Sequence, residues 1–204
     1  MAQIVDYDTV LQTLLGQGLK SLYYNSGSFG FPQGVATRTV GWIGPPDPTI
    51  RPEALSFTRQ IEPPSSQRLM ELTLQAWGEF LPGVVWAMPR SHWAYELDFG
   101  SKDWMPAVLA NCGVNSADLA PLTTGAALEF NWEDSGQFAS FLATLLDNLS
   151  GSSDFQLVWP GQPIVCTVHH HKQLWWTTPD DSIYRALNDL PERATTHPDK
   201  GGKT

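Results

Sequence analysis

The fold is decided by residues 127–159, which read ALEFNWEDSGQFASFLATLLDNLSGSSDFQLVW. Ala127–Trp132 alternates between apolar and polar side chains over most of its length, which is typical of a half-buried strand. From Ser135 the apolar residues recur at helical spacing and predict a helix with one buried face. Phe155–Trp159 is a short apolar run, as expected of a strand inside a sheet. The stretch therefore predicts the order strand, helix, strand.

The same order occurs earlier in the chain, and the two stretches align without a gap. Residues 54–86 share eight identities with residues 127–159 when residue 54 is placed on residue 127. The identical pairs are Ala54/Ala127, Leu55/Leu128, Phe57/Phe130, Leu69/Leu142, Leu72/Leu145, Gly78/Gly151, Val85/Val158 and Trp86/Trp159. Such a match indicates an internal repeat. The alternative is two ordinary α+β units that both place Leu in helices and Trp on strands.

Further elements complete each unit. In the first unit we predict strands at Val84–Met88 and His92–Phe99, and a short helix at Asp103–Cys112. In the second unit we predict strands at Ile164–His171 and Leu174–Thr177, followed by a helix that ends at Pro191. The predicted fold class is α+β, with two tandem β-α-β-β-α units that form antiparallel sheets covered by helices on one face. An N-terminal helix, about residues 8–19, precedes them.

The predicted boundaries divide the chain into four parts. Residues 1–52 hold the N-terminal helix and a segment rich in Pro and Gly. Residues 53–122 and 123–190 are the two units, which together form one compact domain. Residues 191–204 are predicted to be a disordered tail. The order of elements resembles the tandem strand–helix–strand–strand modules of GyrI-like ligand-binding domains, a resemblance of topology that implies a fold suited to ligand binding.

The composition excludes several classes of partner. The 204 residues carry a net charge of −9, and only 12 are Lys or Arg. A phosphate-binding surface needs clustered cations, so we predict neither nucleic acid nor an anionic membrane surface as a partner. The two cysteines match no metal-binding spacing and are predicted to be reduced. The acidic N-terminal residues are unlike a signal peptide, so we predict a cytoplasmic protein.

Nine Trp residues are an unusual number for this length and suggest a binding surface. We predict an aromatic-lined groove between two pseudo-symmetric halves, formed by Trp86, Trp93, Trp159 and Trp176 and edged by Glu96. Its partner would be a small molecule or a protein, and a homodimer is a further possibility. The alternative is that these rings belong to the core.

The run His169-His170-His171 is the most conspicuous polar feature. On a strand, His169 and His171 would share one face, where their rings could bind a divalent transition metal such as zinc. We predict His92 as a third ligand, with Glu96 or Asp98 beside it. The alternative is a strand edge whose histidines face water.

The sequence thus leaves two functions open. The leading prediction is a non-enzymatic ligand- or protein-binding module that needs no cofactor. The alternative is a metal-dependent, hydrolase-like enzyme that uses the His and carboxylate cluster. The sequence leaves open whether the protein is an enzyme, because it contains no complete catalytic motif.

Overall fold

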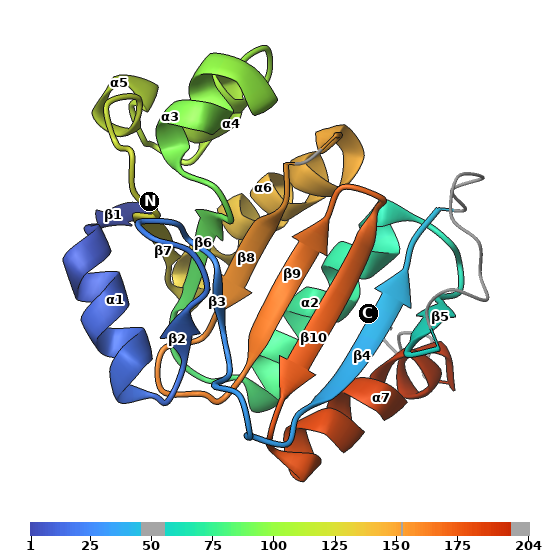
Figure 1. The fold of residues 1–204 in the computed structure, drawn as a ribbon. Coiled ribbons are helices and arrows are strands. Elements are labelled where there is room, and N and C mark those ends of the chain that lie inside the picture. Colours follow the sequence, from blue (N-terminus) through green and yellow to red (C-terminus); the bar gives the residue numbers. More distant parts are fainter. Residues whose placement is uncertain (46–55, 152, 197–204) are drawn as a thin grey trace.

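The computed structural model describes residues 1–45, 56–151 and 153–196. A mixed eight-stranded sheet forms the centre of the protein, in the order β1-β7-β6-β8-β9-β10-β4-β5 (Figure 1). Neighbouring strands run antiparallel, apart from β4 and β5, which are parallel. The strands are β1 (Gln3–Val5), β4 (Arg38–Ile43), β5 (Thr58–Gln60), β6 (Val85–Pro89), β7 (Ala127–Phe130), β8 (Phe155–Val158), β9 (Val165–His169) and β10 (Gln173–Thr178). The α+β class is confirmed.

Three long helices, α2 (Ser66–Phe80), α6 (Ser135–Asn148) and α7 (Asp181–Thr196), cover one face of the sheet (Figure 1). The first of them begins where the Ser65 side chain accepts a hydrogen bond from the Arg68 amide at 3.0 Å. Apolar side chains of α6 and of the sheet meet in the main core. The largest fully buried side chains of this core include Phe130, Phe138, Phe141, Phe155, Trp42, Trp93, Trp159 and Trp176.

A second, smaller core lies on the opposite face, under α1 (Tyr7–Gly16) and a hairpin of β2 (Lys20–Ser21) and β3 (Phe29–Gly30). These elements lie in front of only one half of the sheet, over β7, β6 and β8 (Figure 1). The buried side chains between them are Val10, Leu14, Leu19, Phe29, Trp86, Met88, Ala127, Val158 and Val165. Burial of apolar surface therefore holds the N-terminal segment to the sheet.

One polar clamp fixes the hairpin to the sheet. The side-chain oxygen of Gln156 accepts from the Phe29 amide, and its side-chain nitrogen donates to the Phe29 carbonyl, both at 2.8 Å. Gln156 and Phe29 are almost completely buried, at 2% and 1% exposure. The clamp thus satisfies two backbone groups that water does not reach.

The other half of this face, formed by β9, β10, β4 and β5, is uncovered. Within the described residues, no helix lies over it (Figure 1). Strand alternation and the register place one set of side chains there. The set contains Thr39, Ile43, Thr58, Thr167, His169, Gln173, Trp175 and Thr177. We call this region the uncovered face.

The predicted strand at residues 92–99 is wrong. This segment is helical, with α3 (Trp93–Tyr95) running into a π-helix, η2 (Glu96–Gly100). The His92 side chain caps the first turn by accepting from the Tyr95 amide at 3.1 Å. With α4 (Met105–Asn111) and α5 (Ser116–Leu119), these helices form an insertion beyond one end of the sheet (Figure 1).

The two predicted units therefore differ in their second halves. After β6 the chain enters the helical insertion, whereas after β8 it continues through β9 and β10 to α7. A short 3-10 helix, η3 (Trp132–Asp134), separates β7 from α6. Residues 54 and 55 of the first predicted strand lie outside the described residues. The tandem arrangement accordingly stays a prediction.

The predicted end of the last helix at Pro191 is also wrong. Helix α7 continues through Pro191 to Thr196, so residues 191–196 are not a disordered tail. Leu187 and Leu190 are fully buried on its sheet-facing side, which anchors the helix up to the proline. The rest of the predicted tail, from residue 197, lies outside the described residues. None of the described helices has the length and apolar character that a membrane crossing requires.

Candidate metal centre

The register of the sheet places five side chains in one row on the same face. They are Arg90, Asp154, His169, Gln173 and Ile43. Phe155 pairs with both Pro89 and Val168, so Arg90, Asp154 and His169 are neighbours at the ends of β6, β8 and β9. The Arg90 amide donates to the Asp154 carbonyl at 2.9 Å and continues the ladder. The row extends across β10 and β4, where Gln173 pairs with His169 and with Ile43.

A tight turn follows His169 and carries the other two histidines. It contains three residues, His170, His171 and Lys172, and is closed by the Lys172 amide donating to the His169 carbonyl at 3.0 Å. Lys172 has a φ of 59°, in the left-handed region where hairpins of this length usually place Gly. The turn therefore holds the side chains of His169, His170 and His171 close to one another.

The three imidazole rings form a compact group. Ring centroids of His169 and His170 are 4.2 Å apart, those of His170 and His171 are 4.3 Å apart, and those of His169 and His171 are 5.1 Å apart. One nitrogen from each ring lies within 4.8 Å of the other two. All three side chains are partly exposed, so the group is accessible from solvent.

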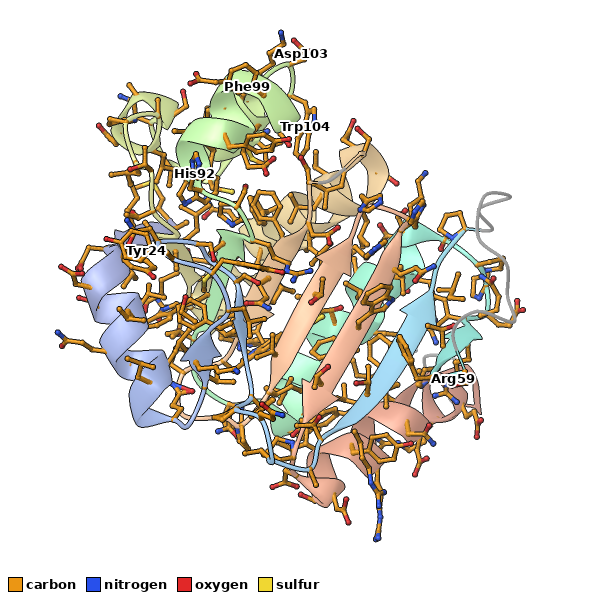
Figure 2. The ribbon with its side chains drawn as sticks, in the orientation of Figure 1. Tyr24, Arg59, His92, Phe99, Asp103 and Trp104 are labelled. Carbon is orange, nitrogen blue, oxygen red and sulfur yellow. The ribbon has the colours of Figure 1, made fainter. Side chains whose placement is uncertain are left out.

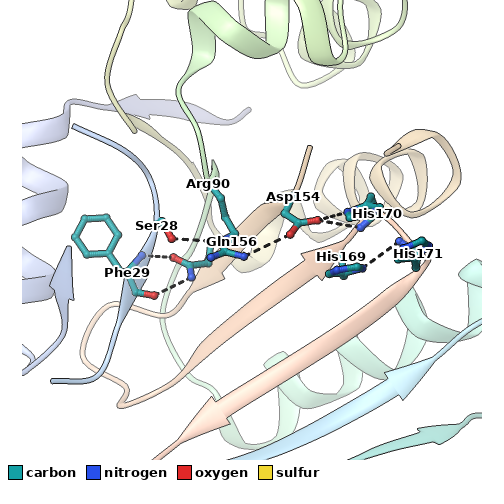
Figure 3. Close-up of polar contacts among 8 residues, drawn as sticks. All are labelled: Ser28, Phe29, Arg90, Asp154, Gln156, His169, His170 and His171. Carbon is teal, nitrogen blue, oxygen red and sulfur yellow. Dashed lines mark hydrogen bonds and ion pairs between the residues drawn. The ribbon is translucent and has the colours of Figure 1, made fainter. Parts of the chain in front are cut away.

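Asp154 fixes the orientation of His170. One carboxylate oxygen is 2.8 Å from His170 Nδ1 and also accepts from the His170 amide at 3.1 Å (Figure 3). The other oxygen is 3.4 Å from the Arg90 guanidinium, which also donates to Ser28 Oγ at 3.2 Å. A carboxylate accepts hydrogen bonds, so Nδ1 of His170 is the donor of this one, and in a neutral ring Nε2 then carries the lone pair.

The side chain of His169 is held by an aromatic neighbour and by the backbone of the turn. Its ring stacks on Trp175 with centroids 4.3 Å apart, and its Nδ1 accepts from the His171 amide at 3.3 Å. Burial lowers the pKa of His169 to about 4, while the charge of Asp154 acts in the opposite direction. The His169 ring is therefore neutral at neutral pH.

Trp175 and Phe57 place an aromatic surface beside the histidines. Trp175 is half-buried on the uncovered face, and Phe57 is 37% exposed. The Phe57 ring packs edge-on against the Trp175 ring, with ring centroids 5.7 Å apart. Trp175 Nε1 donates to the Gln173 side-chain oxygen at 2.7 Å. Within the described part of the chain, the buried Gln173 side-chain nitrogen has no hydrogen-bond partner.

The four Trp residues predicted to line a groove lie elsewhere. Trp93, Trp159 and Trp176 have no exposed surface, because they form part of the core under the helical layer. Trp159 and Trp176 do contact each other, with stacked rings 5.5 Å apart. Trp86 is 5% exposed under α1, on the opposite face, where its Nε1 donates to Glu129 at 2.8 Å. In this structure the four rings do not form a groove.

Glu96 is fully buried in the insertion and does not edge a binding surface. Its two carboxylate oxygens accept from Ser91 Oγ at 2.8 Å and from Ser101 Oγ at 2.9 Å. Asp98 follows it in the same π-helix. Both carboxylates therefore belong to the helical insertion and not to the strand face predicted for them.

The predicted metal ligands are brought together only in part. His169 and His171 lie in one group, whereas His92 caps α3 on the insertion (Figure 2) and does not belong to that group. The sequence prediction missed His170 and Asp154. It assumed a strand as far as residue 171, which would point His170 to the other face. Asp154 could be found only from the pairing of β8 with β9.

Comparisons with known proteins do not assign a family or a function to this site. No protein-family model matches the chain, and neither the curated proteins nor the solved structures contain a match.

Proposed function

We propose that this protein binds a divalent transition metal ion, such as zinc, through His169, His170 and His171. The observation that carries the proposal is the convergence of one nitrogen from each ring within 4.8 Å. Imidazole nitrogens are common zinc ligands, at about 2.0–2.1 Å from the ion. A tetrahedral site then needs nitrogens about 3.4 Å apart, so the rings would approach one another by at most about 1.4 Å.

Asp154 supports a built site over an incidental run of histidines. Metal-binding histidines commonly donate their second ring N–H to a carboxylate, which fixes the ring and raises its basicity. Asp154 has this relation to His170, and it is itself held by Arg90. Because Asp154 reaches the turn from another strand, a run of histidines outside the fold would lack this partner.

Binding without catalysis is the function we favour. Both oxygens of Asp154 are engaged, one by His170 and one by Arg90, so this carboxylate is not placed to act as a general base. The hydrolase-like alternative keeps one supporting observation. Three histidine ligands leave a fourth position open, which is the ligand count of many catalytic zinc sites.

The test uses untagged protein loaded with Zn²⁺ or Co²⁺. We expect one metal ion per chain by elemental analysis, and its loss in the His169→Ala/His171→Ala double variant. Asp154→Asn should weaken metal affinity roughly 10- to 100-fold, because it removes the charge that orients and activates His170. Asp147→Asn removes the same charge from an exposed position on α6 and should leave the affinity unchanged.

A matched measurement in denaturant separates the two interpretations. A built site should lose most of its affinity when the chain unfolds, since Asp154 is then no longer opposite His169. Equal affinity in wild type, Asp154→Asn and unfolded protein would contradict the proposal. Thermal unfolding of each metal-free variant shows whether it is folded before its affinity is compared.

We also propose that residues 54–86 and 127–159 arose by duplication. In support, β6 pairs with β8 and α2 packs beside α6, so two pairs of corresponding elements are neighbours, whereas β5 and β7 lie in opposite halves of the sheet. Asp154 lies at the start of β8, beside the end of β6, and the three histidines follow on the neighbouring strand β9 and its turn. A cytoplasmic location is likewise part of the proposal, supported by the buried free thiols of Cys112 and Cys166.

A further inference from the structure

This inference rests on the proposed metal site. We infer that the remaining coordination position takes the carboxylate of a small organic acid, whose apolar ring lies against Trp175 and Phe57. The ligand would thus join the two features of the uncovered face, its histidine group and its exposed aromatic surface.

The charges at the end of the sheet favour an anion over a neutral ligand. The row supplies one negative charge, on Asp154, which is paired with the positive charge of Arg90 at 3.4 Å. Three imidazole ligands are neutral, so the two charges of a divalent ion would not be balanced by these side chains. A carboxylate supplies both an oxygen donor and the opposite charge.

The aromatic surface begins directly beside the ligand group. Trp175 stacks on His169, so a carboxylate bound to a metal there would bring its organic part over the uncovered face. Phe57 extends the apolar surface on the side of β5. An aromatic ring that packs against such side chains gains about 0.5–1.5 kcal/mol beyond area burial, up to roughly tenfold in affinity.

Two polar groups near Trp175 fit the other atoms of such an acid. Gln173, one strand away from His169, has a buried amide nitrogen that lacks an acceptor among the described residues. This nitrogen is fully buried, so the second carboxylate oxygen would reach it after a rotation of the Gln173 side chain. Thr167 pairs with Trp175 across β9 and β10 and adds a hydroxyl on the same face.

The experiment uses the full chain loaded with Co²⁺, whose visible absorption reports changes in the coordination sphere. The probes are benzoate, acetate and the neutral analogue benzamide. We expect benzoate to change the spectrum with an affinity about tenfold higher than that of acetate, and benzamide to leave the spectrum unchanged. Trp175→Leu should remove the advantage of benzoate and keep acetate binding. Tyr24→Leu, at a side chain 93% exposed on another part of the surface, is the matched control.

The outcomes separate this inference from the proposed function. If Co²⁺ does not bind, the metal site itself is refuted. If Co²⁺ binds stoichiometrically but neither acid changes its spectrum, or benzoate and acetate bind equally, the ligand assignment is refuted. Should Trp175→Leu fail to fold, Phe57→Leu removes the other aromatic side chain. It should reduce the preference for benzoate, and an unchanged preference would count against the inference.

Discussion

Replacing Gln156 by Leu should weaken the attachment of the N-terminal layer to the sheet. The substitution removes two hydrogen bonds of 2.8 Å and leaves the amide and the carbonyl of Phe29 without partners. Both groups are buried, and each unsatisfied group costs about 1–3 kcal/mol. Burial of the apolar leucine side chain offsets this cost by about 1 kcal/mol. We expect a net loss of about 1–5 kcal/mol in the free energy of unfolding.

Urea denaturation followed by far-UV circular dichroism measures this loss, and hydrogen exchange at the Phe29 amide localises it. The amide should exchange much faster in Gln156→Leu than in wild type, while amides in α6 should change less. Gln3→Leu makes the same replacement at an exposed position on β1 and should alter stability by no more than about 0.5 kcal/mol. A loss below 1 kcal/mol together with unchanged exchange at Phe29 would refute the reasoning.

Two further outcomes test the core and one helix end. Trp176→Ala should cost about 3–5 kcal/mol in urea denaturation, because the ring is fully buried between Trp42 and Trp159; a cost below 1 kcal/mol would contradict this. Hydrogen bonds from Ser182 and from the amides at the start of α7 lower the pKa of Asp180 from its ordinary value. Its stabilising effect over Asn is therefore complete above the unfolded-state pKa and is lost as the pH falls through the lower folded-state pKa. Melting temperatures of wild type and Asp180→Asn should converge in acid, and a constant difference would argue against the assignment.

Local patterns predicted the second half of the chain well. The helix predicted to begin at Ser135 begins there, and the strands near residues 127, 155, 165 and 174 are present. These elements have a consistent period and clear turn residues at their ends. Strands β1 and β4 pair with β7 and β10, which are distant in the sequence. Local patterns do not predict these pairings, because tertiary packing decides them.

The segment at residues 92–99 shows why alternation alone fails. The positions of Trp93 and Leu97 are compatible with one face of a strand as well as with a helix. In the structure, however, His92 caps a helical turn, and Trp93 Nε1 donates to the Ala126 carbonyl at 2.7 Å. Glu96 is buried with two serine donors. Local side-chain hydrogen bonds, together with the bond from Trp93 to the distant Ala126, therefore favour the helical conformation, and apolar alternation does not display them.

The candidate site was predicted in part for the same reason. His169 and His171 are visible as a run, but Asp154 becomes their neighbour only through the β8–β9 register. The predicted Trp groove failed because large aromatic residues serve the core as readily as a surface. Trp175, which stays half-buried, differs from the adjacent Trp176 only by the face of the strand on which it lies.

The strand order has a consequence for synthesis on the ribosome. Gln3 of β1 pairs with Glu129, and Ile43 of β4 pairs with Gln173, so both strands emerge long before their antiparallel partners. At about 5–20 residues per second, the wait is roughly 6–25 seconds. Phe29 is likewise synthesised long before Gln156, its hydrogen-bond partner. During that interval the apolar side chains of the N-terminal segment cannot be buried against these partner strands.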